Sequence, residues 1–232
     1  MSGAYFDQFK IVGLVALTNS SMMMIVTVVV VLLLFKGIHL VPVRWQSIIE
    51  LIYDHFHGVV KENLRPGGLK NFPFILSLFF FIVFLNVLGL SPYVFTPTVH
   101  IVVTLGLSFS IIIGVTLAGF RGFEWDFFSI FMPGGAPLGL APLLVLIETV
   151  SYMSRALSLG VRLAANLSAG HLLFAILAGF GFNMLIGSGL GGSLPLLIMV
   201  FITLLEMAVA VIQAYVFCLL TTIYLTDTVV LH

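Results

Sequence analysis

Apolar residues occur in long runs along the chain, and short polar or proline-containing stretches separate these runs. A helix needs about 20 apolar residues to cross a hydrocarbon core that is about 30 Å thick. Five runs approach or exceed that length, at residues 21–40, 72–90, 99–120, 142–180 and 195–226. The pattern therefore predicts an all-α polytopic membrane protein with about five membrane crossings.

The segment 42–64 has a different pattern, because its apolar residues recur at helical spacing with charged residues between them. A helix of this kind lies along the membrane surface, and Pro66 with the two glycines after it would end the helix. Asp54, His55 and His57 could suggest a metal site, but a solvated polar face explains the same residues. We therefore predict an interfacial amphipathic helix.

The last two runs are longer than one crossing requires. About 39 and about 32 helical residues would measure about 58 and about 48 Å. Helices of that length that stay in the membrane must tilt by roughly 50–60°, beyond the usual range of about 0–40°. A kink at Gly160 or Gly170, or ends that protrude, would also accommodate the length. The apolar sequence and the glycine-rich connection at 181–194 favour a steeply tilted helical hairpin.

Composition supports the membrane assignment. Hydrophobic residues make up 61% of the 232 residues and charged residues only 8%, whereas a soluble domain has about 25% charged residues. The net charge of zero provides no basic surface for nucleic acid, and the single cysteine, Cys218, excludes an internal disulfide framework. Phosphate-binding loops and metal-ligand clusters are not recognisable. We expect one membrane domain, residues 1–232, with no cofactor and no metal.

The positions of lysine and arginine predict how the chain is oriented. Most of them lie in the 36–70 connection, and Arg121 begins the 121–141 connection, whereas 86–98 and 181–194 contain neither residue type. The first two connections are therefore expected inside and the last two outside, which puts the N-terminus outside and the C-terminus inside. No internal repeat is evident, and this argues against a pseudo-symmetric secondary transporter.

Polar residues interrupt the first long helix, although an arginine at membrane depth costs about 2.5–3.5 kcal/mol on insertion scales. At about 100° per residue, four of them form one stripe along the helix: Glu148, Arg155, Arg162 and Asn166. Ser158 lies near the edge of this stripe. Such residues persist where a helix faces a partner or a water-filled path.

The second long helix carries Glu206 and Gln213 on one face, at a spacing of two helical turns. In an antiparallel hairpin, residues near the turn meet first, so His171 is expected to approach Glu206. Further from the turn, Arg162 is expected to approach Gln213. His171 faces nearly the opposite side of its helix from Arg162.

These residue types indicate proton movement. Arginine keeps its proton at physiological pH, so Arg162 can act as a fixed positive barrier and attract a passing carboxylate. His171 and Glu206 can exchange protons, and Glu148 lies toward the inner end of its helix. A fixed cation between two groups of titratable residues indicates two half-channels rather than one continuous pore.

Structural roles are open alternatives for several of these residues. Glu148 and Arg155 could form an ion pair, His171 could make an ordinary interhelical hydrogen bond, and Glu206 could be a neutral buried acid. A free-standing ion channel or secondary transporter could use the same polar stripe, and a scaffold subunit would need none of its chemistry.

Two segments are familiar as a pair. SLGVRLAANLSAGH (158–171), followed by LEMAVAVIQAYVFCLLTTIYL (205–225), closely resembles the signature of subunit a of rotary, F-type ATP synthases. NVLGLSPYVFTPT (86–98), APLLVLIETVSYMSRALSLGVRL (141–163) and WQSIIELIYD (45–54) extend the resemblance. It covers nearly the whole chain and looks most like the mitochondrially encoded forms of plants and protists.

The resemblance implies specific roles. Arg162 matches the arginine that faces the rotor ring, with Gln213 beside it. His171 and Glu206 match the pair that lines the outer half-channel, and Glu148 matches an acid of the inner path. Asn166 and Ser158 match polar neighbours on the ring-facing helix.

The same resemblance implies partners, a place in the cell and a function. The partners are a rotor ring of carboxylate-bearing subunit c hairpins, peripheral-stalk and other stator subunits, the lipid bilayer and protons. The implied location is the mitochondrial inner membrane, with a bacterial plasma membrane as the alternative. The implied function couples proton flow to rotation and ATP synthesis, without a nucleotide site in this chain.

Overall fold

The structure is a computed structural model, and it describes most of the chain. Eight stretches are described: residues 10–11, 13–14, 17–36, 43–63, 66–91, 94–123, 141–188 and 193–229. The predicted 121–141 connection and the last part of the predicted first crossing lie largely outside them.

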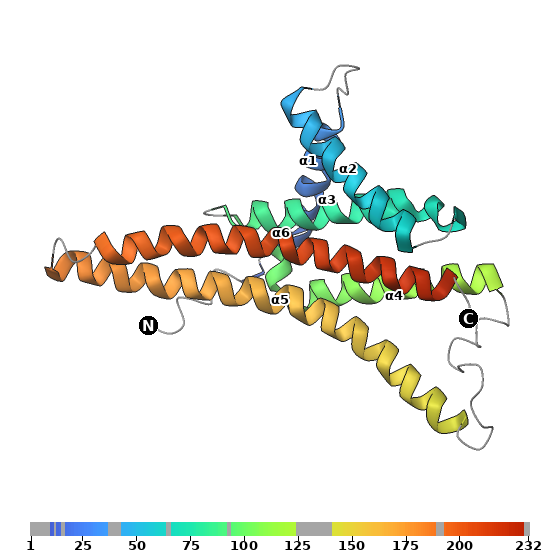
Figure 1. The fold of residues 1–232 in the computed structure, drawn as a ribbon. Helices are drawn as coiled ribbons and strands as arrows, with labels where there is room; N and C mark the ends of the chain where they lie inside the picture. The colour runs from blue at the N-terminus through green and yellow to red at the C-terminus, as the bar shows by residue number, and fades with distance from the viewer. Residues whose placement is uncertain are drawn as a thin grey trace. The chain divides into compact units, whose positions relative to one another are not determined.

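Helices account for almost all of the described residues (Figure 1). In chain order the α-helices are α1 (Asn19–Leu34), α2 (Arg44–Asn63), α3 (Phe72–Gly89), α4 (Ile101–Phe123), α5 (Ala141–Ser188) and α6 (Ser193–Val229). The 3-10 segments η2 (Pro66–Asn71) and η3 (Pro97–Val99) precede α3 and α4. Two strands of two residues each, β1 (Gly13–Leu14) and β2 (Leu17–Thr18), pair antiparallel before α1. The prediction of an all-α fold is confirmed.

Four helices in the described stretches are long and apolar enough to cross a membrane, at Leu69–Gly89, Ile101–Arg121, Pro142–Met184 and Leu197–Thr226. The remaining apolar helix, α1, has 16 residues, which corresponds to about 24 Å. The amphipathic helix predicted at 42–64 is present as α2.

The helix α5 is longer than the sequence pattern predicts. It continues to Ser188, well into the glycine-rich stretch expected to form the turn. A helix-interior glycine costs only about 1 kcal/mol relative to alanine, and apolar residues surround the glycines here. At Gly181, an added Cβ would lie 3.2 Å from the Cβ of Pro195 on α6. This glycine therefore serves close helix packing, while the tilt of the hairpin in a membrane stays a prediction.

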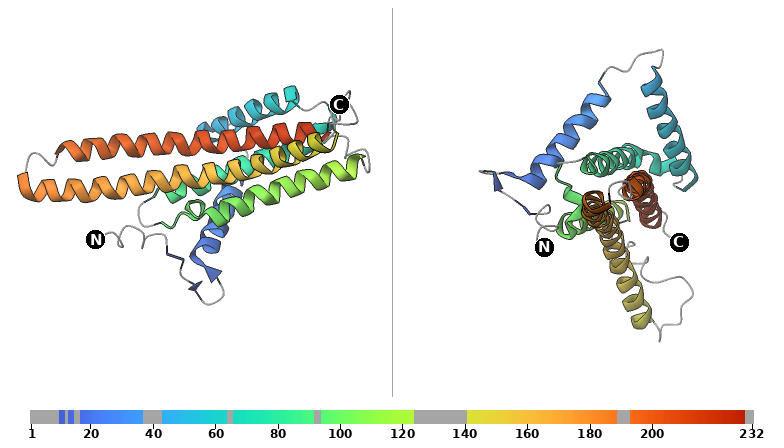
Figure 2. Two further views of the ribbon diagram at one scale, coloured as in Figure 1. Left: turned by 90° about the horizontal axis from the view of Figure 1, so that it is seen from below. Right: turned by 90° about the vertical axis from the view of Figure 1, so that its left-hand side faces the viewer.

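The described chain divides into two compact units. The first comprises residues 1–32, 81–104 and 161–214. In it, the second part of α5 and the first part of α6 run antiparallel, side by side in every view (Figures 1 and 2). Both helices bury residues of small or moderate size in this unit, and these are Leu163, Ala164, Leu167, Ala210 and Ala214. Asn86 of α3 is fully buried against this pair and donates a hydrogen bond of 3.4 Å to the carbonyl oxygen of Ala210.

The second unit comprises residues 33–80, 105–160 and 215–232. Aromatic side chains of α2, α3 and α6 form much of its core. The ring of Phe56 packs on that of Phe79 with centroids 4.6 Å apart and on that of Tyr215 with centroids 5.8 Å apart. At Gly160, an added Cβ would lie 2.9 Å from the hydroxyl oxygen of Ser108, so α5 and α4 approach closely there. The single domain expected from the sequence stays a prediction.

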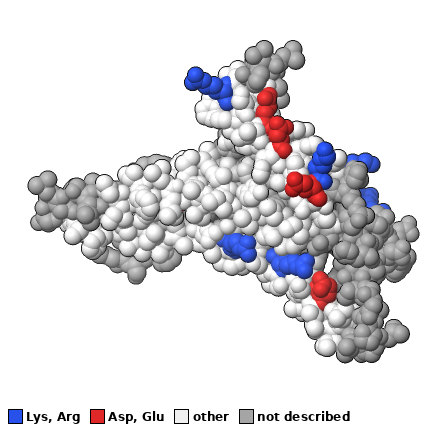
Figure 3. Space-filling view, viewed as in Figure 1, with Lys and Arg blue, Asp and Glu red and all other residues white. Residues whose placement is uncertain are grey.

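Much of the visible surface carries neither acidic nor basic side chains (Figure 3). Large apolar side chains are exposed on every membrane-length helix, for example Val102 at 83%, Leu146 at 62% and Leu204 at 64%. A soluble monomer rarely exposes apolar patches of this extent. Such surfaces are expected to contact lipid or the helices of partner subunits.

Candidate functional site

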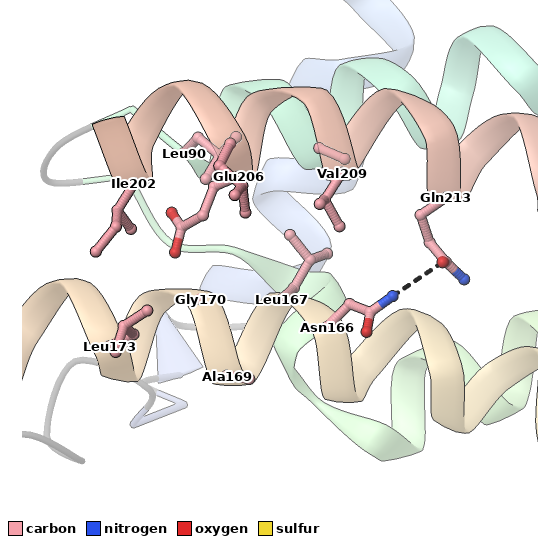
Figure 4. Close-up of a pocket in the computed structure, with 12 residues that line it drawn as sticks. Leu90, Asn166, Leu167, Ala169, Gly170, Leu173, Ile202, Glu206, Val209 and Gln213 are labelled. Carbon is pink, nitrogen blue, oxygen red and sulfur yellow. Dashed lines mark hydrogen bonds between the residues drawn. The ribbon is translucent and has the colours of Figure 1, made fainter. Parts of the chain in front are cut away.

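A pair of amide side chains joins α5 to α6 in the first unit. Asn166 donates from its Nδ2 to the Oε1 of Gln213, over 3.0 Å (Figure 4). Gln213 is only 6% exposed, whereas Asn166 is exposed. Within the described part of the chain, the Nε2 of Gln213 has no hydrogen-bond partner. The pair sets which turn of α5 faces which turn of α6.

The carboxyl group of Glu206 lies two turns of α6 away from Gln213, against Gly170 of α5 (Figure 4). A Cβ added at Gly170 would collide with this carboxyl group and would lie 2.8 Å from its Cδ. Oε1 of Glu206 is buried, and the described residues provide no hydrogen-bond partner for it. Only glycine leaves room for the carboxyl group at this position.

A cavity of about 290 Å³ lies beside these groups. Its polar lining comes from Asn166, Glu206 and Gln213, and most of the remaining lining is apolar. This volume has room for several water molecules. The Oε1 of Glu206 and the Nε2 of Gln213 are buried beside this cavity without partners among the described residues, and buried polar groups are costly without partners.

His171 follows Gly170 on α5 and contacts the segment between α3 and α4. Its Nε2 lies 3.1 Å from the hydroxyl oxygen of Thr96. Ser168, one turn earlier on α5, donates a hydrogen bond of 3.2 Å to the carbonyl oxygen of Val99 in the same segment. These two contacts hold the α3–α4 segment against the part of α5 that carries His171.

Arg162 lies one turn before Asn166 on α5 and is exposed. Leu163 and Ala164 after it are buried, at 0% and 1% exposure. The helix therefore turns its apolar side into the first unit and leaves the arginine side chain outward. An outward arginine on a membrane helix requires a carboxylate or water nearby.

The second unit holds the other predicted polar residues of α5. Arg155 and Glu148 form an ion pair with Nη2 and Oε1 3.8 Å apart, and both side chains are 38% exposed. The guanidinium carbon of Arg155 also lies 6.0 Å from the ring centroid of Tyr224. Ser158 is exposed on the same helix. The ion pair that the sequence left open as a structural alternative is therefore present.

The structure brings together some of the predicted residues in an unexpected way. Gln213 hydrogen-bonds to Asn166, one turn of α5 from Arg162, while the expected approach of Arg162 to Gln213 stays a prediction. Glu206 lies against Gly170, the residue next to His171. Sequence reasoning missed Thr96 and the role of Gly170. The threonine-proline pair at Thr96 was a signal for an extended residue at a turn, but not for its contact with α5.

A helical membrane protein that buries acid and amide groups in a cavity between two of its helices has the features of an ion-translocating subunit. Comparison with known proteins gives the family. A sequence model described as ATP synthase A chain matches residues 19–226. The chain is 72% identical over 232 residues to ATP synthase subunit a of Metridium senile, with 100% of both chains covered.

Two further relatives are also similar over most of their length. ATP synthase subunit a of Brassica napus is 47% identical over 251 residues, with 97% of this chain and 96% of the relative covered. That of Marchantia polymorpha is 45% identical over 252 residues, with 100% of each covered. The chain therefore belongs to the ATP synthase A chain family. It is a proton-translocating stator subunit and a multi-pass protein of the mitochondrial inner membrane.

Proposed function

We propose that this subunit conducts protons through two half-channels, which end on opposite sides of Arg162. The observation that carries the proposal is the buried, unpartnered Oε1 of Glu206 beside a cavity of about 290 Å³ in the described structure. An ionisable group inside a membrane protein that has no structural partner is expected to serve transport. The cavity supplies space for the water that would carry protons to it.

The outer half-channel contains His171 and Glu206. Both side chains can gain and lose a proton, and the carboxyl group of Glu206 lies against Gly170, the residue that precedes His171 on α5. A proton entering from the outer side would pass these two residues and reach a carboxylate on the rotor. The amide pair of Asn166 and Gln213 lies beside the cavity and provides a polar surface without a titratable group.

Arg162 separates the two half-channels. Its guanidinium group stays charged at any physiological pH, so it repels hydronium and attracts a deprotonated rotor carboxylate. Its exposure on α5 supports a position at the surface that faces the rotor. Each proton that crosses a membrane potential of 100 mV releases about 2.3 kcal/mol of free energy. The barrier prevents this free energy from being lost as leak.

The inner half-channel contains Glu148, with Ser158 between it and Arg162 in the sequence. The ion pair of Glu148 is loose, because its Oε1 lies 3.8 Å from the Nη2 of Arg155 and its side chain is partly exposed. The carboxylate can therefore also exchange protons. A proton released from the rotor would leave along this carboxylate. The partial exposure supports access from the inner side.

The complex includes a rotor ring and other subunits. We assign the ring's carboxylate-bearing subunit c hairpins to the surface around Arg162, and peripheral-stalk and other membrane stator subunits to the remaining apolar surface. The charge distribution in the sequence supports an N-terminus on the intermembrane-space side and a C-terminus on the matrix side.

The test replaces Arg162 in the assembled ATP synthase. Arg162→Ala should abolish proton-driven ATP synthesis in reconstituted vesicles, while ATP hydrolysis by the catalytic part continues. Arg155→Ala on the same helix is the matched control and should retain most of the synthesis. Full synthesis with Arg162→Ala would refute the proposal. The chain reconstituted without its ring should show little proton flux, whereas a free-standing channel would conduct.

A further inference from the structure

Thr96 is buried in the segment between α3 and α4 and is held in one orientation. It is 5% exposed, and its backbone is extended, with φ −97° and ψ 102°. Pro97 favours this conformation, because a proline restricts the residue before it to extended backbone. The β-branched side chain of threonine is also restricted at χ1. The direction of the Thr96 hydroxyl group is therefore set by its own backbone and by its neighbours.

The hydroxyl group of Thr96 has two partners. It donates to the carbonyl oxygen of Gly89 over 2.7 Å, and it lies 3.1 Å from the Nε2 of His171. A carbonyl oxygen can only accept a hydrogen bond, so the single hydroxyl proton of Thr96 belongs to the bond with Gly89. Toward His171 the hydroxyl oxygen can therefore only accept a hydrogen bond. The Nε2 of His171 must therefore be the donor.

The close fit between Thr96 and Gly89 depends on the missing side chain at Gly89. A Cβ added there would lie 2.7 Å from the hydroxyl oxygen of Thr96 and 2.9 Å from its Cβ. Gly89 is the last residue of α3 and is buried. Any larger residue at this position would move the hydroxyl group away from both of its partners.

We propose that Thr96 is a positioning residue that keeps the neutral imidazole of His171 in the tautomer with its proton on Nε2. This role rests on the proposed function of His171 as a proton carrier. A neutral imidazole has one N–H group and one nitrogen with a free lone pair. With Nε2 protonated, the nitrogen that binds the next proton is Nδ1.

The proton balance then determines how His171 works. The incoming proton binds the lone pair of Nδ1 and gives an imidazolium with both nitrogens protonated. Loss of the Nδ1 proton restores the starting tautomer and leaves the bond to Thr96 intact. Loss of the Nε2 proton instead would leave a lone pair of Nε2 facing the lone pairs of the Thr96 hydroxyl oxygen, and the hydrogen bond would be replaced by repulsion. His171 therefore takes up and releases its proton at the same nitrogen and does not pass it through the ring.

The wild-type complex provides the first test. Solid-state NMR of the assembled ATP synthase, with ¹⁵N-labelled histidine, reports which imidazole nitrogen carries the proton. The chain has six histidines, and a difference spectrum against His171→Gln would assign the signal. At a pH where the imidazole is neutral, the protonated nitrogen of His171 should be Nε2. If the neutral imidazole of His171 carries its proton on Nδ1, the inference is wrong, and this result needs no substitution at Thr96.

Substitutions at Thr96 provide the second test. Thr96→Val keeps the shape and removes the hydroxyl group, so His171 should become a mixture of tautomers. ATP-driven proton pumping should then fall by about fivefold, the effect expected from one lost hydrogen bond. Thr96→Ser should restore the single tautomer and the rate. Gly89→Ala should mimic Thr96→Val, because it displaces the hydroxyl group without removing it. An unchanged tautomer in Thr96→Val would overturn the inference.

Thr98 supplies a matched control. It lies in the same segment, is 1% exposed, and its hydroxyl oxygen has no hydrogen-bond partner among the described residues. Thr98→Val should leave the tautomer of His171 and the pumping rate unchanged. His171→Leu separates this inference from the proposed function. Unaltered pumping in His171→Leu would refute the proposed function, while impaired pumping there with a normal Thr96→Val would refute only the role of Thr96.

Discussion

Asn166 and Gln213 form an amide pair in which one partner is exposed and the other is buried. The Nδ2 of Asn166 donates to the Oε1 of Gln213 over 3.0 Å, and Gln213 is 6% exposed. Asn166 is exposed and lines the cavity. The two partners therefore differ in what each loses when the other is replaced.

Removing Asn166 should cost more stability than removing Gln213. Asn166→Leu leaves the buried Oε1 of Gln213 without its partner, which costs about 1–3 kcal/mol. Gln213→Leu leaves an exposed amide that water in the cavity can satisfy. The temperature at which the complex dissociates should therefore drop further for Asn166→Leu, with Asn183→Leu on exposed α5 surface as the control. Equal losses in the two variants would contradict this interpretation.

Gln213→Leu should also affect proton pumping less than Arg162→Ala, because the fixed charge remains. The measurement is ATP-driven acidification of vesicles that contain the assembled complex. A complete loss of pumping in Gln213→Leu would show that the amide itself is part of the barrier.

Gly170→Ala should impair proton transport by moving Glu206. The new methyl group would occupy the space of the Glu206 carboxyl group, because the Cδ of Glu206 lies 2.8 Å from the ideal Cβ position at Gly170. Overpacking of this kind typically costs about 1–3 kcal/mol. We expect a severalfold lower pumping rate in the assembled complex. Gly106→Ala and Gly114→Ala on α4 are controls, because an added Cβ there meets nothing within 4 Å, and both should pump normally.

Much of this fold follows from the sequence because helix formation in a membrane depends on local patterns. Apolar runs of about 20 residues predict crossings, and the four helices of that length begin and end within a few residues of the predicted bounds, except at the end of α5. The spacing of Glu206 and Gln213 likewise predicts their common face. Local periodicity is sufficient for both conclusions.

The contacts of the site could not be predicted in the same way. Thr96 and His171 are 75 residues apart in the sequence, and no local pattern shows which loop residue meets a given helix. The sequence allows a kink at Gly170, but it does not show that the missing side chain there leaves room for the carboxyl group of Glu206. Which residue of the polar stripe on α5 hydrogen-bonds to Gln213 depends on the register between α5 and α6. That register is decided by packing rather than by periodicity.

Glu206→Gln should reduce proton transport and stabilise the protein at the same time. The substitution keeps the shape of the side chain but removes its ability to carry a proton. In the described structure the buried Oε1 lacks a partner, so a neutral amide should be at least as stable as a carboxylate there. We expect at least a tenfold lower pumping rate with an equal or higher dissociation temperature. A lower temperature together with normal pumping would assign Glu206 a purely structural role.

A double-mutant cycle on Glu148 and Arg155 can separate the role of Glu148 as an ion-pair partner from its role in proton transport. A half-exposed ion pair typically contributes less than about 1 kcal/mol, so Arg155→Gln should change stability and pumping little. Glu148→Gln should lower pumping severalfold, because the inner path loses its carboxylate. If Glu148 served only as the partner of Arg155, both single variants would have the same small effect, and the double variant would add nothing. A pumping defect confined to the variants that lack Glu148 would instead assign this carboxylate to the proton path.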